Sequence, residues 1–373
     1  MLRLRSEERT APGPLISAPT ESRPMTHPKE LVVLYPAPQS TERIFAPETL
    51  RRLHEEFEVL DLEGDPDAER QLDLALPRAF AVVGQPELPA ERVERAVSLR
   101  ALCNVEGNFF PNVDYAACAD RGVHVLGCGP AYAQAVAEYS LGLALDLARG
   151  ITREDRAFRA GAEGYTFASN TDSILLRGAE IGLIGFGNLG RALHELLVPF
   201  RATIRVYDPW LPERHLEEHG VIPASLDEVL ETSQVLFVLA TITEESERLL
   251  SEARLRRLRP GARLVLVSRA AVADFTALIE LVSQGHFLAA VDVWPEEPVT
   301  ADHPARAVEG LVLSAHRAGG IPAAFEKIGE MVLDDLLQIR AGLPPVRMQV
   351  AARELVHRYR SRPVTTAAGA RNA

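Results

Sequence analysis

The fold is decided by residues 180–209, which read EIGLIGFGNLGRALHELLVPFRATIRVYDP and place Gly185, Gly187 and Gly190 in G-x-G-x-x-G spacing. A short apolar strand precedes these glycines, and leucines at helical spacing follow them. In such a unit the first glycine permits a tight turn, the second lets the backbone approach a pyrophosphate, and the third lets helix and strand pack closely. The stretch therefore predicts a dinucleotide-binding turn whose phosphates face a helix N-terminus.

An acidic residue ends the next predicted strand of this unit. Asp208 follows residues 203–207 and lies eighteen residues after Gly190, where a carboxylate accepts hydrogen bonds from both hydroxyls of an adenosine ribose. Taken alone, an Asp before Pro209 also fits a residue that initiates a turn. In its context, and with no Arg directly after it to receive a 2′-phosphate, Asp208 predicts NAD rather than NADP.

The composition limits the class of protein. With 373 residues, 47% of them hydrophobic and 25% charged, the chain suits a soluble globular protein of two ordinary domains. A net charge of −12 argues against nucleic acid as the main partner, because polyanions bind clustered Lys and Arg. The sequence has no long uninterrupted apolar stretch and no apolar signal region, so we expect a cytoplasmic protein without a membrane partner. Three cysteines without C-x-x-C spacing predict neither disulfides nor a metal site.

Apolar strands and amphipathic helices alternate along the chain. In the first part this alternation predicts a parallel sheet covered by helices. A long helical pattern at 131–158 has no strand signal, which places a domain boundary near 130. The second part continues the dinucleotide unit into a doubly wound sheet. The main predicted strands are 31–36, 58–62, 79–84, 203–207, 234–240, 262–269, 287–294 and 311–315, and the main predicted helices are 47–57, 251–258, 274–284 and 322–341.

Three polar residues stand at or just past the C-terminal ends of predicted strands: Arg269, Glu297 and His316. Ligands of open α/β sheets bind at those ends. An Arg there can bind a carboxylate and polarise a carbonyl. A His can move the hydroxyl proton while a nicotinamide moves hydride, and a neighbouring Glu would hold the imidazole and raise its pKa. Singly, each also fits a surface cation, a loop acid or a structural His, but their order after a dinucleotide unit predicts an active site.

At this point the chain resembles the D-isomer-specific 2-hydroxyacid dehydrogenase family over nearly all of residues 31–345. The resemblance rests on AVAEYSLGLALDLARG, GLIGFGNLGRAL with VYDP, the segment from TITEESERLL to SRAAVADFTAL, DVWPEEP and LVLSAHRAGG. It places the family's catalytic Arg, Glu and His on Arg269, Glu297 and His316. Glu297 is preferred to Glu296 because it directly precedes a proline.

The resemblance implies an α/β fold of two doubly wound domains, with a Rossmann NAD-binding domain inserted into a flavodoxin-like substrate domain. We expect residues 131–316 to form the NAD-binding domain, and residues 30–130 with 317–350 to form the substrate domain. Residues 1–29 lack apolar periodicity, so we expect a disordered tail there. Residues 351–373 are rich in Arg and Ala, and we expect a mobile C-terminal tail. The resemblance also implies a homodimer through the cofactor domains. Further cofactor contacts are expected at Asn188, Leu189, Thr243 and Asp292.

One loop departs from the family pattern. Residues 105–114, VEGNFFPNVD, occupy the carboxylate-binding loop, but Phe109 stands where the family has Gly and Pro111 where it has Asp. We expect the backbone N–H groups of Asn108 and Phe109 to bind the substrate carboxylate. The side chains of Phe109 and Phe110 either reshape the pocket or belong to the core.

The sequence therefore predicts an oxidoreductase that transfers a hydride between NAD(H) and a 2-oxo acid/D-2-hydroxy acid pair. Two alternatives stay open. A formate dehydrogenase of the same superfamily fits less well, because the resembling enzymes carry Gln at the position of Glu297. An NAD(H)-sensing binding protein, like the corepressors that share this fold, would carry the same residues. Turnover of a 2-oxo acid separates this last alternative from an enzyme.

Overall fold

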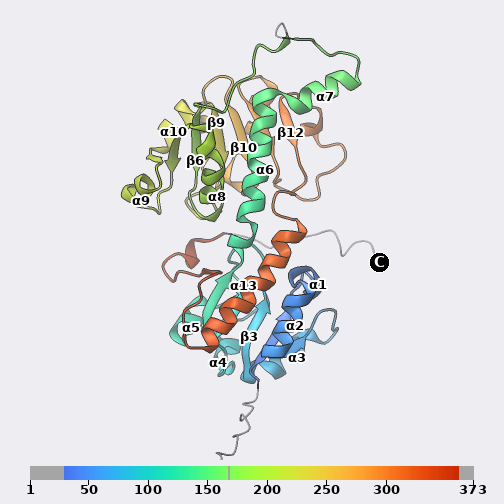
Figure 1. The fold of residues 1–373 in the computed structure, drawn as a ribbon, viewed down its shortest axis with the longest axis vertical. Helices are drawn as coiled ribbons and strands as arrows, with labels where there is room; N and C mark the ends of the chain where they lie inside the picture. The colour runs from blue at the N-terminus through green and yellow to red at the C-terminus, as the bar shows by residue number, and fades with distance from the viewer. Residues whose placement is uncertain (1–28, 167–168, 361–373) are drawn as a thin grey trace, which may run out of the picture.

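The computed structural model describes residues 29–166 and 169–360, and these form two lobes joined by long helices (Figure 1). The prediction of a disordered tail at 1–29 falls, apart from Lys29, outside the described residues. The expected α/β architecture of two parallel sheets is confirmed. Because helices cover each sheet, its central strands are buried along nearly their whole length, whereas its edge strands are partly exposed.

The first sheet belongs to the lower lobe in Figure 1. Its order is β13-β5-β4-β3-β1-β2, so its five parallel strands follow the flavodoxin-like order 2-1-3-4-5. β13 comes from the far end of the chain and pairs with β5 in the antiparallel direction. The strands are β1 (Leu31–Tyr35), β2 (Glu58–Asp61), β3 (Ala79–Gly84), β4 (Ala101–Asn104), β5 (His124–Gly127) and β13 (Gln349–Val350).

The second sheet forms the upper lobe and has the order β12-β11-β10-β9-β6-β7-β8. The order reverses between β6 and β9, as in a Rossmann fold, and the ligand crevice of such sheets lies at that switch point. The short β8 was not expected from the sequence. The strands are β6 (Glu180–Ile184), β7 (Thr203–Tyr207), β8 (Ile222–Pro223), β9 (Val235–Val238), β10 (Arg263–Leu266), β11 (Leu288–Val291) and β12 (Leu311–Leu313).

The helices of the lower lobe, which we name the substrate lobe after its expected role, differ in length and in what they cover. The longest, α13, packs against α1, α2 and α6, and its buried face completes the core of the first sheet. These helices are α1 (Thr41–Ile44), α2 (Pro47–Glu56), α3 (Ala68–Ala75), α4 (Ala90–Arg95), α5 (Tyr115–Asp120) and α13 (Pro322–Arg340). The helices of the other lobe are α7 (Ile151–Arg159), α8 (Asn188–Leu197), α9 (Glu213–Glu218), α10 (Leu226–Thr232), α11 (Glu252–Leu255) and α12 (Phe275–Ser283).

One helix, α6 (Gly129–Arg149), belongs to both lobes (Figure 1). Near its start Ala131 lies in the core of the first sheet, whereas Leu143 and Leu147 lie in the core of the second. The predicted helix over 131–158 is not continuous. Gly150 ends α6 with φ +67°, a left-handed cap that glycine adopts without steric cost, and α7 begins directly after it.

Tyr132 on α6 lies where the two cores meet and packs against both. Its ring stands edge-on to Phe325 of α13, with centroids 6.0 Å apart. Two glycines border the ring, since a Cβ at Gly107 or at Gly319 would lie 3.4 or 3.3 Å from it. The Tyr132 hydroxyl donates to the carbonyl oxygen of Val105 over 3.3 Å.

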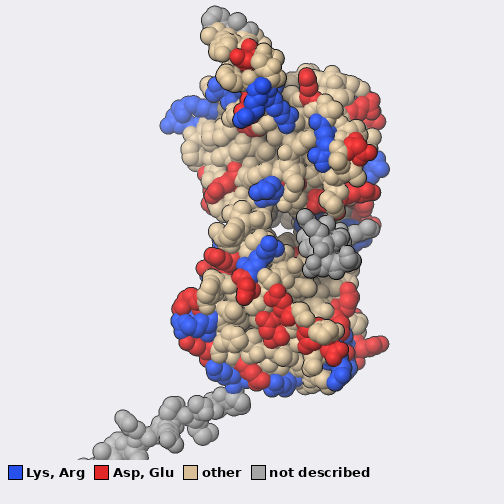
Figure 2. All heavy atoms as spheres, turned by 90° about the vertical axis from the view of Figure 1, so that its right-hand side faces the viewer, with Lys and Arg blue, Asp and Glu red and all other residues tan. Residues whose placement is uncertain are grey.

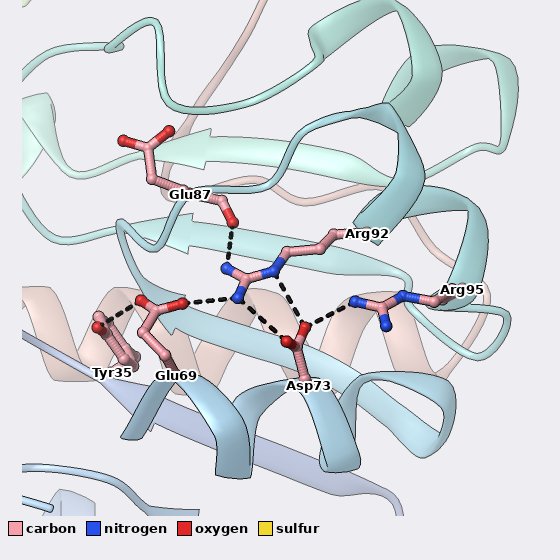
Figure 3. Close-up of polar contacts among 6 residues, drawn as sticks. All are labelled: Tyr35, Glu69, Asp73, Glu87, Arg92 and Arg95. Carbon is pink, nitrogen blue, oxygen red and sulfur yellow. Dashed lines mark hydrogen bonds and ion pairs between the residues drawn. The ribbon is translucent and has the colours of Figure 1, made fainter. Parts of the chain in front are cut away.

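A polar network joins α3 to α4 on the substrate lobe (Figure 3). The guanidinium of Arg92 contacts Glu69 at 2.6 Å and Asp73 at 3.0 Å, and it donates to the Glu87 carbonyl at 2.7 Å. The hydroxyl of Tyr35, at the end of β1, donates to Glu69 at 2.8 Å. Because the Arg92 side chain is only 16% exposed, this network is better shielded than an ordinary surface ion pair and fixes both helices to the sheet.

A buried carboxylate directs the chain from α13 into β13. Asp335 is fully buried and accepts backbone hydrogen bonds from Val346 and Arg347 at 2.7 and 2.9 Å and from Met348 at 2.7 Å. Charge-assisted bonds of this kind are among the stronger ones in proteins. They fix the turn that brings Gln349 beside β5.

The chain stays ordered beyond β13. The expectation of a mobile tail from residue 351 differs from the structure over 351–360, where the backbone binds the other lobe through Glu244 N–H and Arg358 C=O at 3.1 Å. Isolated anchors such as Tyr359 hold this segment, and they leave no periodic signal in the sequence. Residues 361–373 lie outside the described part of the chain.

Surface charge is mixed on the face shown in Figure 2, where Lys and Arg alternate with Asp and Glu on both lobes. Within the described ranges, no helix combines the length and the apolar character needed to cross a membrane.

Candidate active site

A cavity of about 1050 Å³ lies between the lobes, at the carboxyl ends of strands from both sheets. This volume lies at the upper end of the range of small-molecule sites, as a dinucleotide with a substrate requires. The cavity brings together most of the residues predicted from the sequence: Asn108, Gly185, Gly187, Asn188, Leu189, Asp208, Thr243, Arg269, Asp292, Glu297 and His316. Gly190 and Phe109 are not among its lining residues.

The three glycines of the turn have different surroundings. Gly185 has φ +96°, and a Cβ there would meet the Ala240 backbone at 2.9 Å. A Cβ on Gly190 would lie 2.5 Å from the carbonyl oxygen of Gly185, so this glycine permits the close packing of α8 on β6. Gly187 has nothing within 4 Å of its Cβ position and faces the cavity. The turn therefore has the open backbone that a pyrophosphate needs.

Asp208 is held at the adenosine end of this turn. Its two carboxylate oxygens accept hydrogen bonds from the N–H groups of Phe186 at 2.8 Å and Trp210 at 3.0 Å. Each oxygen keeps lone pairs for the hydroxyls of a ribose. The turn-initiating role is therefore present, and it leaves the carboxylate able to take the predicted ribose-binding role.

Arg191 lines the cavity in the first turn of α8, and the sequence reasoning missed it. Its guanidinium donates to the Asn188 side chain at 3.1 Å and to the Phe186 carbonyl at 3.4 Å. A cation beside the glycine turn suits a phosphate. The available signal was its position directly after Gly190.

Asp292 follows β11 and is fully buried. Its carboxylate accepts hydrogen bonds from the Ser314 hydroxyl at 2.5 Å and from the N–H groups of Arg317 at 2.8 Å and Ala318 at 2.9 Å. The backbone N–H of His316 donates to the Asp292 carbonyl at 2.7 Å. Although it lines the cavity as expected, Asp292 also fixes the turn that carries His316.

His316 and Glu297 form a hydrogen-bonded pair, with 2.8 Å between Nδ1 and Oε2. The other oxygen of Glu297 accepts the N–H of Trp294 at 3.0 Å. Burial opposes ionisation of Glu297, but the bond and charge of His316, the Trp294 N–H and the charge of Arg269 outweigh it, so the pKa of this carboxyl is lowered. Glu297 is therefore an anion at neutral pH.

Arg269 lines the same cavity and is held by a hydrogen bond from its Nη1 to the Ser268 carbonyl at 2.7 Å. Burial lowers the pKa of the guanidinium, while the charges of Glu106 and Glu297 and the nearby Tyr132 raise it. Arg remains a cation throughout the pH range of a protein. Within the cavity, Arg269 thus lies near two carboxylates, those of Glu106 and Glu297.

The departing loop places its large side chains in the core. Phe109 and Phe110 are 4% and 3% exposed, and Phe109 contacts Tyr115 and Tyr359 with ring centroids 6.4 and 5.6 Å apart. The sequence left two possibilities for these rings, reshaping the pocket or belonging to the core, and the structure shows the second. Asn108 does line the cavity.

Glu106 was not singled out from the sequence, yet it lines the cavity and is only 7% exposed. Its signal was a lone charge between the strand 101–104 and the apolar pair Phe109–Phe110. Burial raises the pKa of the thiols of Cys103, Cys118 and Cys128, and none of the three lines the cavity.

A Rossmann turn, an acid at the end of its second strand and an Arg, Glu and His that line one cavity form the arrangement expected of an NAD-dependent dehydrogenase. A sequence profile described as "D-isomer specific 2-hydroxyacid dehydrogenase, NAD binding domain" matches residues 141–318. The chain belongs to the D-isomer-specific 2-hydroxyacid dehydrogenase family, and NAD is its cofactor.

Named relatives differ in substrate. A glyoxylate reductase of Thermofilum pendens is 29% identical over 269 residues, which are 69% of this chain and 77% of that protein. A D-3-phosphoglycerate dehydrogenase of Archaeoglobus fulgidus is 27% identical over 267 residues, 71% of this chain and 50% of that protein. Among solved structures, a phosphoglycerate oxidoreductase from Rhizobium etli is 45% identical with a TM-score of 0.79, covering 87% of this chain and 99% of that one.

The different surroundings of Gly187 and Gly190 give a testable contrast. Gly187→Ala adds a methyl group only where the phosphates bind, so the melting temperature should stay within about 1 °C while NADH affinity falls at least tenfold. Gly190→Ala collides with backbone and should lower the melting temperature by several degrees, the shift expected from a loss of about 1–3 kcal/mol. Calorimetry and NADH fluorescence titration measure both. Equal NADH affinity in Gly187→Ala and wild type would remove Gly187 from the phosphate site.

Proposed function

We propose that the protein reduces a 2-oxo acid to a D-2-hydroxy acid and catalyses the reverse reaction. In this proposal Arg269 and His316 act on the substrate, and Glu297 holds the His316 ring. The carrying observation is the His316–Glu297 pair at 2.8 Å in the cavity that also contains Arg269 and the glycine turn. Bound NADH supplies the hydride and NAD accepts it.

The residues divide the remaining work. Arg269 binds the substrate carboxylate and polarises the carbonyl. Because Nδ1 of His316 is bonded to Glu297, Nε2 is the nitrogen left to face the substrate oxygen. In reduction Nε2–H gives its proton to that oxygen as hydride reaches C2, and in oxidation Nε2 takes the hydroxyl proton. Glu297 is the positioning residue that holds the ring and stabilises its charge.

The charge of the cavity supports a substrate with one anionic group. Near Arg269 the buried Glu106 adds a negative charge that opposes a second carboxylate or a phosphate on the substrate. Arg306 also lines the cavity, but it is exposed and donates to the carbonyls of Thr300 and Val299 at 2.9 and 3.1 Å. We infer that the substrate is a monoanionic 2-oxo acid of the glyoxylate type rather than a phosphorylated one.

A panel of 2-oxo acids with NADH tests this function. Monoanionic members should be reduced with kcat/KM at least tenfold above dicarboxylic and phosphorylated members of similar length. Glu106→Gln removes the opposing charge with little change of shape and should narrow that ratio several-fold. Initial rates of NADH oxidation provide the measurement.

Two results would contradict the proposal. A chain that binds NADH but turns over no member of the panel would be a sensor rather than an enzyme. Efficient reduction of a phosphorylated member, with the ratio unchanged in Glu106→Gln, would contradict the monoanionic substrate and leave the dehydrogenase assignment intact.

The pH dependence tests the role of Glu297. Its lowered pKa means that Glu297 faces the His316 ring as a carboxylate at neutral pH. Glu297→Gln deletes that charge, so the protonated form of the ring should lose its electrostatic stabilisation. Reduction needs the imidazolium and should then fail at lower pH than in wild type, whereas oxidation needs the neutral ring and should persist to lower pH. The measurement is kcat/KM against pH in both directions, and we call the fall of each profile its limb. Both limbs should move to lower pH by about one unit, equivalent to about 1.4 kcal/mol.

Glu296→Gln is the matched control, because this neighbour does not line the cavity and should leave both limbs in place. Limbs that stay fixed in Glu297→Gln, or that move toward alkaline pH, would show that Glu297 does not stabilise the imidazolium.

We also propose a homodimer formed through the cofactor lobe. α7 has no buried residue, and the segments 151–166 and 169–175, which we name the arm, extend from the upper lobe (Figure 1). It exposes Ile151, Phe158 and Leu175 at 58%, 63% and 69%. Such a set of exposed apolar side chains is typical of an interface that a two-fold axis duplicates.

Sedimentation should therefore show a dimer for wild type at micromolar concentration, and Phe158→Glu should shift the species toward monomer. Leu74→Glu, at a side chain of equal exposure (64%) on α3, is the control and should stay dimeric. A monomeric wild type would disprove the pairing.

A further inference from the structure

Residues 351–360, which we name the C-terminal strap, leave the substrate lobe and bind the cofactor lobe. At its start the N–H of Ala351 donates to the Val125 carbonyl of β5 at 2.9 Å. Just before it, the side chain of Gln349 accepts a hydrogen bond from Asn188 of α8 at 3.0 Å. The strap is thus a further chain segment that runs from one lobe to the other, in addition to α6 and the segment that leads into α13.

Its far end pairs with the loop that carries Thr243. Tyr359 and Thr243 form an antiparallel bridge. The flanking hydrogen bonds run from Glu244 N–H to the Arg358 carbonyl at 3.1 Å and from Arg360 N–H to the Ile242 carbonyl at 3.2 Å. Ion pairs of Arg358 with Glu245 and Arg360 with Glu244 accompany them at 3.2 and 2.9 Å. These pairs are exposed and contribute little, so the backbone pairing and the Tyr359 ring carry the attachment.

The Tyr359 ring lies between the lobes. It contacts Phe109 of the substrate-domain loop at 5.6 Å and Trp210 of the cofactor lobe at 6.0 Å between ring centroids. Trp210 follows Asp208 by two residues and donates its N–H to that carboxylate. Leu355 and Tyr359 of the strap both line the cavity. Tyr359 therefore lies beside the adenosine end of the site.

We propose that the C-terminal strap completes the adenosine half of the NAD site, with Tyr359 as one of its walls. The strap does not plug the site, because the cavity keeps about 1050 Å³ with the strap in place. By pairing with the loop of Thr243, the strap also keeps the adenosine side of the cleft assembled before the cofactor binds. Such preorganisation increases affinity, since less ordering remains to be done on binding.

Binding measurements on the full-length chain, without any 2-oxo acid, test the proposal. Tyr359→Ala should raise the Kd for NADH and for ADP-ribose by the same factor, roughly tenfold, as expected for loss of an aromatic contact to a base. His357→Ala is the control on the same segment, because its side chain is exposed and does not line the cavity. It should bind both ligands within about twofold of wild type.

A second pair of variants tests the whole segment. A chain that ends at Arg360 should bind NADH like wild type, whereas a chain that ends at Ala351 should bind it at least as weakly as Tyr359→Ala. If the shorter chain fails to fold, the two point variants decide. An unchanged NADH Kd in Tyr359→Ala would overturn the proposal, and so would tighter binding, which would make the ring an obstruction. Neither outcome depends on which 2-oxo acid is reduced or on the roles of Arg269 and His316.

Discussion

The geometry of the proposed active site depends on one buried carboxylate. Asp292 stands just after β11 and takes up two backbone N–H groups and a hydroxyl from the turn after β12. A buried carboxylate without such partners would cost several kcal/mol, so the turn has no comparably stable alternative. That turn holds His316 with φ +51°, a conformation that few non-glycine residues adopt. Asp292 therefore fixes the backbone position of His316, and the hydrogen bond to Glu297 forms on a ring that is already placed.

Much of the fold could be predicted because its signals are local. The glycine spacing around Gly187 and the apolar strands indicate the order of elements along the chain, and the resemblance to the dehydrogenase family implied the Rossmann and flavodoxin-like arrangement of the two sheets. Arg269, Glu297 and His316 could be located for the same reason, since they follow strands whose carboxyl ends must share one edge. Short elements such as β8 escaped prediction, because two residues leave no periodicity.

What the sequence could not reveal depends on contacts between distant segments. Glu106 looks like an ordinary loop acid until the fold brings it near Arg269, which lies more than a hundred residues away in the chain. The orientation of Phe109 depends on Tyr359, from the opposite end of the protein. For the same reason the segment 351–360 was predicted to be part of a mobile tail, because its anchors are single residues whose partners lie on the other lobe.

The surroundings of Tyr132 have a consequence for how the lobes can move. The ring touches both cores and is bordered by Gly107 and Gly319, which offer flat backbone instead of a side chain. On these two sides of the ring no side chain interlocks with it, so Gly107 and Gly319 resist a small turn of one lobe against the other less than larger residues would. Gly107 belongs to the loop of Asn108, and Gly319 lies three residues after His316. A turn of one lobe about Tyr132 would therefore change the distance between that loop and His316, the two parts of the site that we expect to contact the substrate.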